Sequence, residues 1–165
     1  MRIYEGSPRQ DWEEVLRAIG AFADRERMKE LLLLELDAGF IIQGLSLPRD
    51  GAWSESEGKL AKATHELPDD EISKLIDAAE AKRTDGPETT PHTEISNYYE
   101  QAMRVIGAYL DAQKPRDVFL FEQDGAFVLR LLVSATGAAV AGHQLVEFTK
   151  DDILAMIEAA PQQRQ

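Results

Sequence analysis

Residues 12–45 read WEEVLRAIGAFADRERMKELLLLELDAGFIIQGL, and residues 99–132 read YEQAMRVIGAYLDAQKPRDVFLFEQDGAFVLRLL. The two stretches align without a gap, and eleven of the 34 aligned positions carry the same residue. This match predicts an internal tandem duplication, in which two copies of one folded unit are related by a pseudo-twofold axis. The identical pairs are Glu13/Glu100, Arg17/Arg104, Ile19/Ile106, Gly20/Gly107, Ala21/Ala108, Asp24/Asp111, Leu33/Leu120, Glu35/Glu122, Asp37/Asp124, Phe40/Phe127 and Leu45/Leu132.

The similarity returns near the end of each copy, where residues 70–72 (DEI) align with residues 151–153 (DDI). Between the copies, residues 84–92 read TDGPETTPH, and this proline, glycine and threonine content is typical of a linker. We therefore expect a first repeat over 1–83, a linker over 84–92, a second repeat over 93–160 and a frayed tail over 161–165.

Each copy begins with an amphipathic helix, because its apolar residues recur at helical spacing. A β-hairpin follows, and Asp124-Gly125 is typical of the tight turn that joins two such strands. A weaker third strand and a closing helix complete an α-β-β-β-α unit, so the chain is predicted to be α+β, with helices packed on antiparallel sheets. The apolar stripes of the predicted helices span 12–23, 72–79, 99–110 and 153–160. The first helix is expected to start at Ser7 as its N-cap, the second to have residues 69–71 in its first turn, and the last to start at Thr149 as its N-cap. The predicted strands cover 30–37, 39–47, 60–67, 117–123, 126–134 and 143–148.

Gly20 and Gly107 recur in the middle of the first helix of each copy. Glycine in a helix interior costs about 1 kcal/mol relative to alanine. Its recurrence therefore indicates a shared packing requirement, such as the close approach of another backbone.

The strands of the two predicted hairpins are apolar on both faces until Glu35 and Glu122 interrupt them. Leu32 and Leu34 point to one side of the first strand, whereas Leu31 and Leu33 point to the other. A sheet with one face in water would alternate apolar and polar residues cleanly. The second face is therefore expected to be covered by the other copy, by helices or by another chain. The two copies either join their strands into one sheet or face each other across a shared core.

Composition bounds the class of protein. The chain is 44% hydrophobic and 29% charged, with no apolar run near the length of a membrane span and no apolar leader at its start, so we expect a cytoplasmic protein. The absence of cysteine excludes disulfides and thiolate chemistry. A net charge of −12 without a basic cluster disfavours binding to nucleic acid or to anionic membranes.

No motif for phosphate binding, nucleophilic catalysis or zinc binding occurs, so we expect no catalytic residue, no metal ligand and no cofactor. The best chemical candidates are Glu35 and Glu122, which interrupt apolar strands at equivalent positions. Brought together across the axis, two carboxylates would shift each other's pKa and perform acid–base work. The competing interpretation is that each glutamate is exposed or has a structural partner, for example Arg17 or Arg104 on the covering helix.

Three further residues are candidates for binding. Gln43 and Arg130 are polar groups that, with the two glutamates, would converge in a pocket between the copies. Trp53 stands in the polar connection 48–58, which has no close counterpart in the second copy. Its indole is expected either to pack back on the sheet as a lid or to act as a recognition side chain.

The order helix–strand–strand–strand–helix resembles the double-stranded RNA-binding domain. That family holds phosphates with basic residues at the start of its second helix. Here residues 69–71 (DDE) and 150–152 (KDD) are acidic at five of six positions, which excludes RNA binding. The order, size and acidity are also similar to those of type III secretion chaperones, which present sheet and helix faces to unfolded clients, usually as dimers. That resemblance implies a fused dimer, but no sequence motif carries it, and no family is assigned.

The leading hypothesis is a non-enzymatic protein-interaction module, an adaptor or a chaperone-like protein, that binds a protein partner or a second copy of itself through an apolar sheet face. The alternative is a small-molecule binding or sensory protein with a pocket between the two repeats. An enzyme would need two or more titratable groups with shifted pKa values in such a cleft, and no motif points to one.

Overall fold

The computed structural model describes residues 11–46, 61–84, 97–115, 117–134 and 141–160. Trp53, the predicted tail 161–165 and all but the first residue of the predicted linker lie outside these ranges. None of the described helices is long and apolar enough to cross a membrane.

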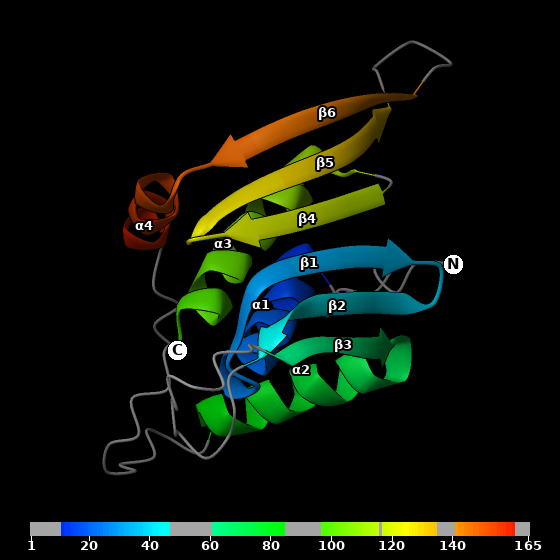
Figure 1. The fold of residues 1–165 in the computed structure, drawn as a ribbon, viewed down its shortest axis with the longest axis vertical. Coiled ribbons are helices and arrows are strands. Elements are labelled where there is room, and N and C mark those ends of the chain that lie inside the picture. Colours follow the sequence, from blue (N-terminus) through cyan, green and yellow to red (C-terminus); the bar gives the residue numbers. More distant parts are fainter. Residues whose placement is uncertain (1–10, 47–60, 85–96, 116, 135–140, 161–165) are drawn as a thin grey trace.

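The described chain forms four helices and six strands in an α+β arrangement (Figure 1). All ten predicted elements are present, and most boundaries lie within two or three residues of those expected. The largest differences are at the start of α1, whose N-cap is Asp11 rather than the predicted Ser7, and at the end of α2, which continues to Thr84 beyond its apolar stripe. In chain order the elements are α1 (Trp12–Arg25), β1 (Met28–Leu36), β2 (Gly39–Ser46), β3 (Ala61–Pro68), α2 (Asp69–Thr84), α3 (Tyr98–Gln113), β4 (Asp117–Gln123), β5 (Ala126–Ser134), β6 (Ala141–Phe148) and α4 (Lys150–Ala159).

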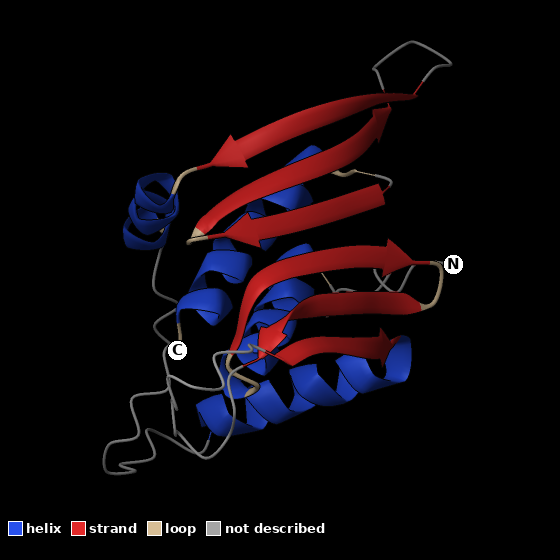
Figure 2. Ribbon diagram, viewed as in Figure 1, coloured by secondary structure: helices blue, strands red, loops and turns tan. Residues whose placement is uncertain are grey.

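The strands form one open antiparallel sheet in the order β3-β2-β1-β4-β5-β6 (Figure 2). The two predicted hairpins meet at its centre, where β1 pairs with β4. Only three residue pairs join these strands, with Leu33 opposite Leu120 in the middle. Of the two arrangements that the sequence left open, the structure therefore has the joined sheet.

The hydrophobic core lies between this sheet and helices α1 and α3, which are behind the sheet in Figure 1. The residues with the predicted helical spacing, such as Leu16 and Ile19 on α1 and Ile106 on α3, are fully buried. Burying one large aliphatic or aromatic side chain contributes about 1.5–3 kcal/mol, so this layer dominates the stability. The sheet residues in the core include Leu31, Leu33, Phe40, Ile42, Val118, Leu120, Phe127, Leu129 and Leu131.

Gly20 and Gly107 lie where α1 and α3 touch. A Cβ atom added to Gly107 would be 2.6 Å from the Cα atom of Glu13, and one added to Gly20 would be 2.7 Å from the carbonyl carbon of Tyr99. These neighbours are backbone atoms, which cannot rotate away. The close backbone approach that the repeated glycines predicted is therefore present, and it allows the helices to pack with little space between them.

Each of these helices is also capped by an aspartate from the other. Asp24 near the end of α1 accepts hydrogen bonds from the backbone N–H groups of Tyr99 (3.2 Å) and Glu100 (2.9 Å). Asp111 on α3 accepts from the backbone N–H groups of Trp12 (2.8 Å) and Glu13 (3.1 Å). The first turn of a helix leaves such donors without partners within the helix. Each aspartate therefore binds the C-terminal part of its own helix to the first turn of the other helix.

Burial raises the pKa of Asp24 to about 6, although the hydrogen bonds from Glu100 and Tyr99 act in the opposite direction. Burial also raises the pKa of Asp111. A raised pKa means that the folded state holds the proton more tightly than the unfolded chain. The stability contributed in this way by Asp24 is full below about pH 4 and is lost as the pH rises through about 6.

We expect this linkage to disappear in D24N. The difference in unfolding free energy between the wild type and D24N should shift in favour of the wild type by about 1–2 kcal/mol when the pH falls from about 7 to about 4.5. This value is smaller than full linkage would give, because the carboxyl group of Asp24 is partly exposed. Urea denaturation across this pH range measures the difference. D77N, which changes an exposed aspartate on α2, is the control. A difference that shrinks on acidification would show that Asp24 acts as an ionised cap.

Candidate functional site

The face of the sheet opposite α1 and α3 is covered by no helix in the described part of the chain (Figure 1). We call it the outer face. Its exposed apolar side chains include Leu145 at 70%, Leu36 at 48% and Phe121 at 37% of full exposure. The apolar side chains of the outer face are Leu32, Leu34 and Leu36 on β1, Ile41 and Leu45 on β2, Phe119 and Phe121 on β4, Val128 and Leu132 on β5, and Leu145 on β6. Polar side chains on the same face include Gln43, Asp117, Arg130, His143 and Glu147.

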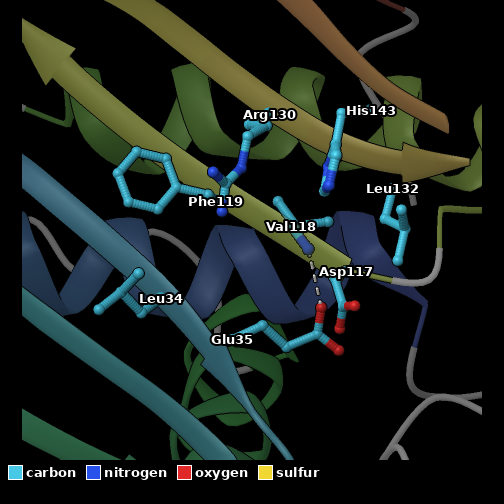
Figure 3. A pocket seen from close by; sticks show the side chains of 8 residues that line it. All are labelled: Leu34, Glu35, Asp117, Val118, Phe119, Arg130, Leu132 and His143. Carbon is cyan, nitrogen blue, oxygen red and sulfur yellow. Dashed lines mark hydrogen bonds between the residues drawn. The ribbon is translucent and has the colours of Figure 1, made fainter.

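A pocket of about 230 Å³ opens on this face, where β1, β4, β5 and β6 lie side by side (Figure 3). It combines an apolar lining with both signs of charge. Figure 3 shows the carboxylates of Glu35 and Asp117 on one side and the side chains of Arg130 and His143 on the other. The lining residues are Leu34, Glu35, Asp117, Val118, Phe119, Arg130, Leu132 and His143.

The pocket exists because the pairing of β1 with β4 stops early. The last paired residues are Leu34 and Phe119. Beyond them the backbone N–H of Val118 donates to Oε2 of Glu35 at 3.2 Å, so a side chain takes the place of a strand–strand hydrogen bond. Glu35 thereby joins the two hairpins and forms one wall of the pocket.

Arg130 contributes the basic wall. Its guanidinium lies over the ring of Phe119, 5.5 Å from the ring centroid, in a cation–π contact. Its neighbours across the sheet are Phe119 on β4 and Leu145 on β6, both apolar. Among the described residues it has no ion pair. His143 is exposed opposite Leu132 on the next strand.

Glu122 lies elsewhere and is only 2% exposed. Its carboxylate accepts hydrogen bonds from the backbone N–H groups of Leu31 (3.2 Å) and Gly125 (2.8 Å) and from the hydroxyl of Tyr99 (2.9 Å). Burial and this neighbouring carboxylate raise the pKa of Tyr99, which keeps the hydroxyl protonated as a donor. Three donors satisfy the buried carboxyl oxygens, so the geometry gives Glu122 a structural role.

The structure does not bring Glu35 and Glu122 together. Each interacts with the opposite hairpin at a different end of the β1–β4 contact, through Val118 and Leu31 respectively, so no carboxylate pair forms. The alternative, a structural role, describes Glu122, but its partners are not the suggested Arg17 or Arg104. Arg17 instead forms an ion pair with Glu100 (3.1 Å), and Arg104 forms one with Glu13 (3.5 Å), because these arginines lie on the helix faces that contact each other.

Of the other three predicted site residues, one lines the pocket, one lies elsewhere on the sheet and one is outside the described ranges. Arg130 lines the pocket together with Glu35. Gln43 lies on β2 and donates to the hydroxyl of Thr64 at 3.2 Å, and it is not among the pocket residues. Trp53 is outside the described ranges. The geometry therefore joins two of the five candidates in one cavity.

Sequence reasoning missed Asp117, Phe119, Leu132 and His143 as pocket residues. Alternation along β4 and β5 was a usable signal, because it puts Asp117 and Phe119 on one side of their strand and Arg130 and Leu132 on one side of theirs. The missing information was the register, which places Asp117 opposite Leu132 and Leu132 opposite His143. Within the described ranges, no group of three or more histidine, aspartate or glutamate side chains is suited to hold a metal ion.

The charged and apolar lining of this pocket is suited to binding a group in which a charged part lies next to an apolar part. Comparison with models of protein families, with curated proteins and with solved structures gives no match to this chain.

Proposed function

We propose that this chain is a non-enzymatic protein-interaction module, an adaptor or chaperone-like protein, whose contact surface is the outer face. The observation that carries the proposal is that the central strands are largely apolar on this face, which is covered by no described helix. Apolar side chains form two continuous rows across the central strands, one through Leu34 and Phe119 and one through Leu32, Phe121 and Val128. A contiguous apolar surface of this kind is typical of interaction sites.

We also propose that the chain is an internal duplication with pseudo-twofold symmetry, with repeats over 1–83 and 93–160. The repeated sequence supports this, and so do contacts that recur at equivalent positions. Asp24 caps α3 as Asp111 caps α1, and Glu35 binds Val118 as Glu122 binds Leu31. In this proposal the outer face extends across both repeats, so it offers one surface twice as wide as that of either repeat.

Charge on the outer face should abolish partner binding without unfolding the protein. We expect F121D/L145D to lose at least tenfold in affinity, because each change puts a carboxylate where the partner would bury apolar surface. The matched control is L154D, which adds the same charge at an exposed leucine on α4, away from this face. Affinity capture from the source organism identifies partners by mass spectrometry, and titration with the purified partner measures the change.

Equal capture by the wild type and F121D/L145D, with both folded by circular dichroism, would contradict the proposal. Loss of capture by L154D as well would point to a general effect of charge rather than to the outer face.

A second function, small-molecule binding or sensing, is favoured by the pocket that Glu35 and Arg130 line together. Its opposite charges and apolar lining would suit a small ligand with polar ends. The two sites share several residues, but Phe121 and Leu145 belong to the outer face and are not among the lining residues. Ligand binding that survives F121D/L145D would therefore favour the second function over the first.

A further inference from the structure

Arg130 is a cation on the outer face with an apolar side chain directly on each side of it. The residues directly opposite Arg130 on the two adjacent strands are Phe119 and Leu145, and both are apolar. The guanidinium of Arg130 lies over the ring of Phe119. In the free protein, water solvates this exposed side chain. A partner that covers Phe121 and Leu145 would also remove water from the guanidinium between them.

Covering an arginine without an ionic partner is unfavourable, because the lost hydration is not replaced. The chain's own carboxylates do not remove this problem in the described structure. Asp117 and Glu147 stand on the diagonals next to Arg130, yet neither forms an ion pair with it. In Figure 3 the guanidinium lies toward Phe119 and the carboxylate of Asp117 lies toward Glu35.

We propose that the partner of the outer face is a protein segment in which a carboxylate side chain is flanked by apolar side chains, and that this carboxylate binds Arg130 at the pocket. The apolar neighbours of the carboxylate pack on Phe119, Leu132 and Leu145. Arginine presents a planar fork of donors that matches a carboxylate, and the exposed His143 at the same pocket adds a further donor. This inference rests on the proposed function and adds the chemistry of the partner.

The test is selection of peptides from a displayed library of random 16-residue sequences against the immobilised full chain. The variants are R130Q, R130E and F121D/L145D, and the control is R25Q, which removes an exposed arginine at the end of α1. We expect the wild type and R25Q to enrich peptides with an acidic residue among apolar ones. R130Q should lose the acidic preference, and R130E should replace it with a preference for lysine or arginine.

An enriched peptide with glutamate is then compared with the same peptide carrying glutamine. We expect the glutamate peptide to bind the wild type about tenfold more tightly, and the difference to fall below about twofold on R130Q.

The remaining outcomes overturn the inference in distinguishable ways. If the enriched peptides need Phe121 and Leu145 for binding but show no preference for acidic residues, the inference about Arg130 is overturned and the proposed function is left standing. If no peptide is enriched in a way that requires Phe121 and Leu145, both the inference and the proposed function are overturned. A wild type that sediments as a dimer while F121D/L145D sediments as a monomer would make a second copy the occupant, which would also overturn this inference.

Discussion

G107A is expected to lower the unfolding free energy by about 3 kcal/mol or more, although alanine is the better helix former by about 1 kcal/mol. The added methyl group would lie 2.6 Å from the Cα atom of Glu13, so α1 and α3 must move apart. That movement loosens the packing of both helices on the sheet and lengthens the hydrogen bonds from Trp12 and Glu13 to Asp111. G20A should have a similar effect, because its methyl group would meet the backbone of Tyr99.

Urea denaturation followed by circular dichroism measures this loss. The matched control is G142A, because a Cβ atom at Gly142 on β6 has no neighbour within 4 Å. We expect G142A to keep wild-type stability to within about 0.5 kcal/mol. A G107A protein as stable as the wild type would mean that α1 and α3 do not approach each other as described.

E122A is expected to destabilise the fold by about 3–5 kcal/mol. The substitution removes the acceptor of three donors, which are the backbone N–H groups of Leu31 and Gly125 and the hydroxyl of Tyr99. It also leaves a cavity at a site that is 2% exposed, where water does not readily replace the lost hydrogen bonds.

Thermal and urea denaturation of E122A and of E147A test this prediction. Glu147 is an exposed glutamate on β6, and its replacement should change stability by less than about 0.5 kcal/mol. E122Q should fall between them, because glutamine keeps one acceptor oxygen. Equal stability of E122A and E147A would rule out the structural role of Glu122.

Local pattern was sufficient to predict the elements of this fold. The helical spacing of Leu16, Ile19 and Ile106 predicted α1 and α3, and Asp124-Gly125 predicted the turn between β4 and β5. These signals act within a few residues, so tertiary contacts are not needed to interpret them. The repeated glycines also pointed to a close backbone approach, because their cost in a helix requires a compensating contact.

The candidate site was predicted less completely. Glu35 and Arg130 were identified as unusual polar residues on apolar strands, and they do line one pocket. Glu122 had the same sequence signature as Glu35, yet it is buried with three donors on the other side of the β1–β4 contact. The two glutamates differ partly in local sequence, because Gly125 comes three residues after Glu122 where Ala38 comes three residues after Glu35, and partly in tertiary surroundings, because the hydroxyl of Tyr99 donates to Glu122.

The sequence by itself determined which segments are helices and strands, that the hairpin strands are apolar on both faces, and that the chain carries a net charge of −12. Only the tertiary structure decided that both hairpins share one sheet, that the helices lie on one side of it and that the outer face is left without a described cover. The physical reason is that the β1–β4 pairing and the α1–α3 contact join residues far apart in the chain. Local spacing encodes which face of an element is apolar, but it does not encode which other surface that face meets.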